Sequence, residues 1–226
     1  MNNGRLRGSS LLSSGITLGG VGIIVGALAT VVIEGSVPVV ADLVGNLGVW
    51  ILLVTLIGAA SPSRTAAIVR VTVFLLAMLL GYYGIYALFF DYLPWGDVLV
   101  WIAVTFVLGI PFALITWYSR GTGWLAACAA AVPVGMLLFS WLPYLLPPIT
   151  MSAAELVNYV TAFDLVAGAA LVVVLPQGNR QRVRVLALAP VVAAAVSLAH
   201  SVVLSEYMAA HGLIGAVEQA HQPDAQ

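Results

Sequence analysis

Seven apolar stretches, separated by short polar turns, most constrain how this chain can fold. A helix needs about 20 mostly apolar residues to cross the hydrocarbon core of a bilayer. The stretches that meet or nearly meet this length are 11–33, 40–60, 66–90, 98–118, 123–146, 153–175 and 183–204. The second is the weakest, because Asp42, Gly45 and Asn46 interrupt its first turns. We predict one integral membrane domain (1–226): an all-α, polytopic transmembrane helix bundle of about seven spans, with a polar C-terminal tail at 205–226.

The composition excludes several classes of protein. Apolar residues make up 62% of the 226 residues and charged residues only 8%, whereas a soluble domain carries roughly 25% charged residues. The net charge of −1 and the lack of a long basic stretch exclude a nucleic-acid partner. The single cysteine, Cys128, cannot form an internal disulfide, so dithiol chemistry is excluded as well. The expected partner of most of the surface is therefore the lipid bilayer.

The charged residues predict the orientation of the spans, because basic residues are enriched at the cytoplasmic side. If the N-terminus is inside, every basic residue falls on the inner side, and all of them are arginine: Arg5, Arg7, Arg64, Arg70, Arg120, Arg180, Arg182 and Arg184. The acids other than Asp164 fall on the outer side: Glu34, Asp42, Asp91, Asp97, Glu155, Glu206, Glu218 and Asp224. We expect the N-terminus inside and the C-terminus outside. The arginine-only, alanine-rich and glycine-rich composition is typical of bacteria and indicates a multi-pass protein of a bacterial plasma membrane.

The first stretch has two interpretations. The basic residues before it and the Ala27-Leu28-Ala29 triplet imitate a signal peptide, and cleavage after Ala29 would leave six spans. A retained helix is favoured, because the stretch is long and its glycines, spaced four, three and four apart, share one helix face: Gly15, Gly19, Gly22 and Gly26. A stripe of small residues lets another backbone approach closely. We expect this stripe to pack inside the bundle.

Asp164 is a carboxylate in the middle of the sixth stretch. Ser152 and Glu155 form a capping box that predicts a helix start at Ser152. Twelve residues at ~1.5 Å each then place Asp164 about 18 Å along the helix, near the bilayer midplane. Thr161 and Gly168 lie three residues before it and four after it, so its helix face is small, polar and suited to packing inward.

Asp164 has no basic partner in this layout. The arginines lie at helix ends, and His200 is predicted to lie about 8 Å nearer the outside by helix rise, so no direct pair is expected. Tyr159 points largely away from Asp164 on the same helix. Desolvation then favours the protonated acid, which can donate a hydrogen bond and exchange protons where water reaches it. Two further hydroxyls, on Tyr82 and Tyr83, either line a cavity or tie helices together.

Signatures of catalysis are absent from the sequence. It contains no metalloprotease, nucleophile-elbow or phosphate-loop motif. The histidines lack metal-ligand spacing, so we expect no metal, no cofactor and no enzyme activity. Three prolines, Pro111, Pro133 and Pro190, interrupt predicted spans. Interrupted helices occur at the binding sites of transporters and also in ordinary membrane helices.

The segment "NLGVWILLVTLIGAASPSRTAAIVRVTVFLLAMLLGYYG", residues 46–84, carries a resemblance. In it Asn46-Leu47-Gly48 leads to Trp50, and a short arginine-containing turn precedes Gly81-Tyr82-Tyr83. With the later "FVLGIPFALITWYSRG", it resembles an uncharacterised family of small multi-pass bacterial, chiefly actinobacterial, integral membrane proteins of unknown function. The resemblance covers roughly the first 140 residues and implies a helical bundle. It implies no activity and no functional residue, and Asp164 lies outside it.

Two functions lead on these observations. The first is a small-solute carrier or solute-binding membrane module, proton-linked through Asp164 with Thr161, His200, Tyr82 and Tyr83 as further polar candidates. The alternative is a non-catalytic accessory or assembly protein that packs with a membrane-protein partner, or with a second copy, through the glycine face. The chain's size also suits the substrate-binding subunit of a multi-component vitamin importer. An intramembrane enzyme ranks third.

Overall fold

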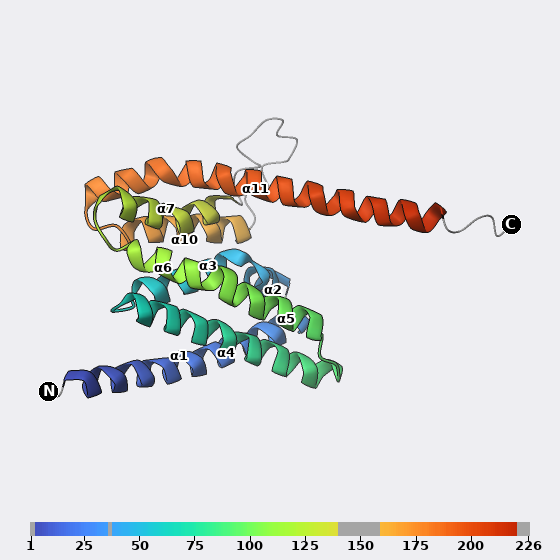
Figure 1. Ribbon diagram of the computed structural model, residues 1–226, viewed down its shortest axis with the longest axis horizontal. Coiled ribbons are helices and arrows are strands. Elements are labelled where there is room, and N and C mark those ends of the chain that lie inside the picture. The colour runs from blue at the N-terminus through green and yellow to red at the C-terminus, as the bar shows by residue number, and fades with distance from the viewer. Residues whose placement is uncertain (1–2, 36–37, 140–158, 221–226) are drawn as a thin grey trace.

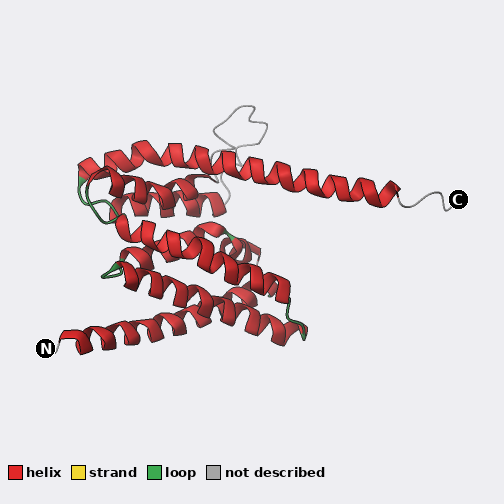
Figure 2. Ribbon diagram, viewed as in Figure 1, coloured by secondary structure: helices red, strands yellow, loops and turns green. Residues whose placement is uncertain are grey.

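The computed structural model describes residues 3–35, 38–139 and 159–220, which form helices joined by short turns. No strand occurs within these ranges (Figure 2). The elements are α1 (Asn3–Glu34), α2 (Pro38–Gly45), α3 (Leu47–Ala59), α4 (Arg64–Phe90), α5 (Trp95–Val104), the π-helical turn η1 (Thr105–Gly109), α6 (Ile110–Tyr118), α7 (Gly123–Phe139), α10 (Tyr159–Val174) and α11 (Asn179–Ala220). The predicted all-α class is confirmed.

Four helices in the described ranges are long and apolar enough to cross a membrane. They are Gly15–Glu34 within α1, Arg64–Phe90, the continuous helix Trp95–Tyr118, and Asn179–Val202 within α11. This finding confirms the prediction of a helical membrane protein. The apolar helices α3, α7 and α10 are shorter, with 10–17 residues each. The predicted capping box of Ser152 and Glu155 lies outside the described residues.

The helices pack side by side in a series, in which each helix contacts the next (Figure 1). At one side α1 lies along α4, which in turn contacts α6. Next come α3 and α6, which pack on each other, then α7 with α10, and finally α11 along α7. The C-terminal end of α11 extends beyond the other helices. It continues to Ala220, so part of the predicted polar tail is helical.

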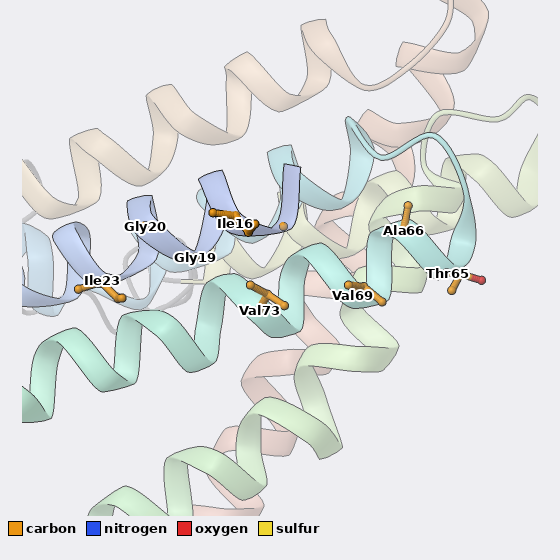
Figure 3. A pocket seen from close by; sticks show the side chains of 9 residues that line it. Ile16, Gly19, Gly20, Ile23, Thr65, Ala66, Val69 and Val73 are labelled. Carbon is orange, nitrogen blue, oxygen red and sulfur yellow. The ribbon is translucent and has the colours of Figure 1, made fainter. Parts of the chain in front are cut away.

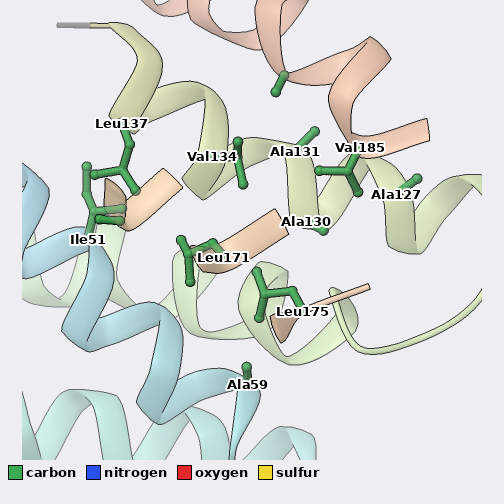
Figure 4. Close-up of a cluster of buried hydrophobic side chains, with 12 residues drawn as sticks. Ile51, Ala59, Ala127, Ala130, Ala131, Val134, Leu137, Leu171, Leu175 and Val185 are labelled. Atoms are coloured by element: carbon green, nitrogen blue, oxygen red, sulfur yellow. The ribbon is translucent and has the colours of Figure 1, made fainter. Parts of the chain in front are cut away.

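The main hydrophobic core lies where α3, α7, α10 and α11 meet (Figure 4). Val134, Leu137, Leu171 and Val185 are at most 2% exposed there. Small residues on α7 let its neighbours approach closely. A methyl group added at Gly135 would lie 2.6 Å from the Cβ of Val192 on α11. Because lipid gives little hydrophobic drive for helix association, such close van der Waals packing is a main source of stability in membranes.

The glycine face of α1 lies against α4. A methyl group at Gly26 would lie 2.0 Å from the carbonyl oxygen of Met78, and one at Gly22 would lie 2.6 Å from that of Phe74. Gly19 has ordinary space near Val73, and Gly15 is open. The two helices therefore separate toward the N-terminus of α1.

The second predicted span is not one continuous helix. It is divided at Asn46 into the eight-residue α2 and the 13-residue α3. The division follows from the sequence, because glycine destabilises a helix and asparagine is a preferred first cap residue. The prolines in the predicted spans do not end their helices as Asn46 does. Pro133 and Pro190 lie inside α7 and α11, and Pro111 lies in the first turn of α6, just after the wide turn η1.

Candidate functional site

The break between α2 and α3 is built around the side chain of Asn46. This residue has extended backbone angles, φ −72° and ψ 131°, as a helix N-cap requires. Its Oδ1 accepts a hydrogen bond from the backbone N–H of Gly48 at 3.1 Å. One of the free N–H groups at the start of α3 is thereby satisfied. The amide nitrogen of Asn46 is left to bind something else.

That amide nitrogen donates a hydrogen bond to Asp164. The distance from Asn46 Nδ2 to Asp164 Oδ1 is 2.8 Å. Asp164 is 2% exposed and Thr161 on the same face is 4% exposed. Gly168 is buried as well. The side chain of Asn46 thus joins two segments that are 118 residues apart, capping α3 with its oxygen and holding the carboxyl group of α10 with its nitrogen.

The absence of a side chain at Gly48 makes room for this carboxyl group. A Cβ atom at Gly48 would lie 1.9 Å from Asp164 Oδ1 and 2.9 Å from its Cγ. Asp164 therefore reaches the backbone at the first turn of α3. Helix N-termini carry a partial positive charge that stabilises anions. The site offers an ionised Asp164 both an amide donor and a helix terminus.

A second polar pair lies farther along the same two segments. The hydroxyl of Tyr159 donates a hydrogen bond to Asp42 Oδ2, and both side chains are exposed. Asp42 precedes Asn46 by four residues and Tyr159 precedes Asp164 by five, which correspond to about 6 and 7.5 Å of helix rise. Tyr159 does point away from Asp164 within α10. However, α2 supplies Asp42, and Asn46 directly follows the end of α2, so polar groups extend from the exposed pair to the buried acid.

The other predicted polar residues belong to different contacts. Tyr82 and Tyr83 lie on α4, with ring centroids 5.1 Å apart, and the carbonyl oxygen of Tyr82 accepts a hydrogen bond from Thr30 of α1 at 2.8 Å. His200 is exposed on α11 and packs edge-on against Phe139 of α7 at 5.4 Å. Asn46 and Gly48 approach Asp164.

Sequence reasoning missed Asn46 as the partner of Asp164, although a signal for it was present. Asparagine is a strong N-cap residue, and here it follows a glycine and is followed two residues later by another. An amide in an otherwise apolar stretch needs partners. A search for amides as well as cations would have identified Asn46 as a candidate.

An apolar groove of about 720 Å³ lies away from Asn46 and Asp164, where α1 and α4 diverge (Figure 3). Ile16 and Ile23 line it from α1, and Val69 and Val73 line it from α4. Thr65 supplies the only polar side chain in its lining. Such a surface suits hydrocarbon and offers little that could orient a polar solute.

No group of three or more His, Cys, Asp or Glu side chains that could hold a metal ion occurs among the described residues. The chain matches no protein-family model, no curated protein and no solved structure.

Proposed function

We propose that the protein is a small-solute carrier whose transport is linked to protons through Asp164. The observation that supports this proposal is the break in an apolar helical segment, at Asn46, facing a buried carboxyl group. Carriers commonly place their binding sites at discontinuous helices, where half-helix ends meet ions or charged groups. Intramembrane acids are costly to keep and commonly mark proton or ion pathways.

Both protonation states of Asp164 have a partner in this geometry. The carbonyl-type oxygen of either form can accept from Asn46 Nδ2. The start of α3 additionally stabilises the ionised form. In the conformation described, Asp164 is sealed at 2% exposure. The short α2, which the Asp42–Tyr159 hydrogen bond connects to α10, is the element whose movement would admit water and solute.

The proposed topology is seven spans, with the N-terminus in the cytoplasm and the C-terminus outside a bacterial plasma membrane. The charge distribution along α4 supports this orientation, since Arg64 begins the helix and Asp91 follows its end. Reporter fusions after Arg64, Arg120 and Arg182 should report a cytoplasmic location. Fusions after Asp91, Pro147 and Gln226 should report an outer one. A cytoplasmic location for the Gln226 fusion would mean that the topology has one span fewer than proposed. Membership of the actinobacterial family remains a prediction beside this topology.

The proton role is tested by the carboxyl infrared band of Asp164, identified as the difference between wild-type protein and Asp164→Asn in lipid bilayers. We expect the band to shift with external pH and to exchange in D₂O, because the polar groups at Asp42 and Tyr159 lead toward it. Asp97→Asn, which removes an exposed acid on α5 that the proposal does not use, is the matched control and should leave this band in place. A band that stays protonated and unexchanged at every accessible pH would overturn the proton role.

Solute coupling is tested in liposomes that contain the purified protein and a pH-sensitive dye. A small polar solute that evokes proton movement with wild-type protein should evoke none with Asp164→Asn, since an amide cannot change its charge. The accessory-protein alternative relied on the glycine face as a docking surface. That face is occupied within the chain, because Gly22 and Gly26 already lie against the backbone of α4. The carrier is therefore the better-supported function.

A further inference from the structure

A polar hollow whose lining does not include Asp164 lies where the ends of helices meet. It has a volume of about 390 Å³, within the roughly 300–1,000 Å³ range of small-molecule sites. Its lining includes Arg64 at the start of α4, Trp117 and Tyr118 at the end of α6, and Arg120 just beyond them. Ser61 and Gln177 complete its polar lining.

The hollow is strongly biased toward positive charge. Two guanidinium groups line it, and no carboxylate does. Neither Arg64 nor Arg120 forms an ion pair with an acid in the described part of the chain. The acids nearest in sequence on the same helices, Asp91 and Asp97, lie at the opposite ends, and the 27 residues of α4 span about 40 Å. An anion in the hollow would meet no repelling group.

The positions of the two arginines are set by contacts that leave N–H groups available. The Arg64 guanidinium carbon lies 5.3 Å from the Trp117 ring centroid and 4.9 Å from that of Tyr118. Arg120 donates from NH1 to the carbonyl oxygen of Ala59, at the end of α3. A guanidinium group has five N–H donors. Stacking on rings uses none of them, and the Ala59 contact accounts for one.

We infer that this hollow binds the phosphate group of an anionic phospholipid. Arginine N–H groups match phosphate oxygens in pairs, and basic pockets between membrane helices are suited to phospholipid head groups. Trp117 and Tyr118 favour the same depth, because indole and phenol rings prefer the head-group region. The inference is independent of the role of Asp164, since it concerns other helix ends and a different ligand.

The test is a set of thermal-unfolding titrations of the full-length protein in neutral detergent. The probes are dioleoylphosphatidylglycerol, dioleoylglycerol with the same chains and no phosphate, and sodium phosphate at matched ionic strength. Ligand that binds only the folded protein raises Tm with its concentration. We expect phosphatidylglycerol to raise Tm at concentrations at which dioleoylglycerol has no effect.

Arg64→Gln should weaken the apparent affinity for phosphatidylglycerol roughly fivefold, and adding Arg120→Gln should weaken it by about the same factor again. Arg180→Gln is the matched control, with the same charge change at an exposed position, and should retain wild-type affinity. The Arg64 side chain donates no hydrogen bond to any residue that the structure describes, so Arg64→Gln keeps the test valid if Arg120→Gln does not fold. Equal affinity of wild-type and Arg64→Gln protein, or equal effects of dioleoylglycerol, would overturn the site. An equal effect of sodium phosphate would overturn the lipid as its ligand.

Discussion

Two helix contacts in this protein use glycine in the same way for different purposes. Where α1 meets α4, Gly26 lets the backbone of the neighbouring helix approach, and the nearest atom to an added methyl group is the Met78 carbonyl oxygen at 2.0 Å. Where α3 meets α10, Gly48 admits a side chain, and the nearest atom is Asp164 Oδ1 at 1.9 Å. The distances are nearly equal, but the atoms differ in how far they can move.

This difference teaches what each contact is built to do. A helix backbone is held by its own hydrogen bonds, so the α1–α4 contact is rigid, and the Thr30 hydroxyl reinforces it by donating to the carbonyl oxygen of Tyr82 on α4. A carboxyl group can rotate away, so the α3–α10 contact is held by the hydrogen bond from Asn46 and can change its geometry. The first contact is suited to support, and the second is suited to a group that changes charge.

The largest loss of stability is expected for Gly26→Ala. Its methyl group would meet Met78 oxygen at 2.0 Å and Tyr82 nitrogen at 2.8 Å, both backbone atoms. We expect a loss of about 3 kcal/mol, the upper end of overpacking costs, measured by reversible unfolding in detergent. Gly20→Ala is the control on the same helix, with open space around it, and should be neutral or slightly stabilising. Equal losses of unfolding free energy for the two variants would show that the α1–α4 contact is not rigid.

A smaller loss, about 2 kcal/mol, is expected for Gly48→Ala, because the colliding atoms belong to a side chain that can rotate. Gly45→Ala, three residues earlier and without a close neighbour, is the control. The decisive measurement is a double-mutant cycle. In an Asp164→Ala background, Gly48→Ala should cost much less than in the wild-type background, because the collision is gone. Additive losses would mean that Gly48 is not there to admit Asp164.

The smallest effect is expected for Asn46→Ala. The variant loses a helix cap, worth about 1 kcal/mol, and an interhelical hydrogen bond, worth about 0.6 kcal/mol on average in membranes. Asn46→Ser keeps a capping oxygen but is too short to hold Asp164, so it should recover most of the stability. If unfolding shows Asn46→Ser to be as unstable as Asn46→Ala, the carboxyl group and not the cap is the main function of this residue.

Much of the fold could be predicted because membrane helices obey strong local rules. Length and hydropathy identified the apolar segments, and the weakness noted at Gly45 and Asn46 coincides with the break between α2 and α3. The spacing of Thr161, Asp164 and Gly168 placed them on one face, and all three are buried. These features depend on neighbours within one or two turns, which a sequence displays directly.

The partner of Asp164 could not be predicted by the same rules. Asn46 lies 118 residues away, and the two meet only because α3 packs on α10. Nothing local in α10 indicates which helix will cover it. The search for a compensating charge also directed attention to arginine and histidine, whereas the structure uses an amide and a helix end. Because these partners are uncharged, counting charged residues in the sequence cannot identify them.

The wide turn η1 has a consequence for how this chain can vary in length. A π turn holds about one residue more than an α turn, and each residue in an α-helix turns the chain by about 100°. Before it, α5 buries no side chain, while after it α6 buries Ala113 and Thr116. Loss of one residue between Thr105 and Gly109 would rotate α5 and Thr105 relative to α6, and of these only Thr105 has a buried side chain to misplace. Insertions and deletions among homologous chains should therefore collect at this turn, which lets the helix absorb evolutionary change in length without disturbing the bundle beyond it.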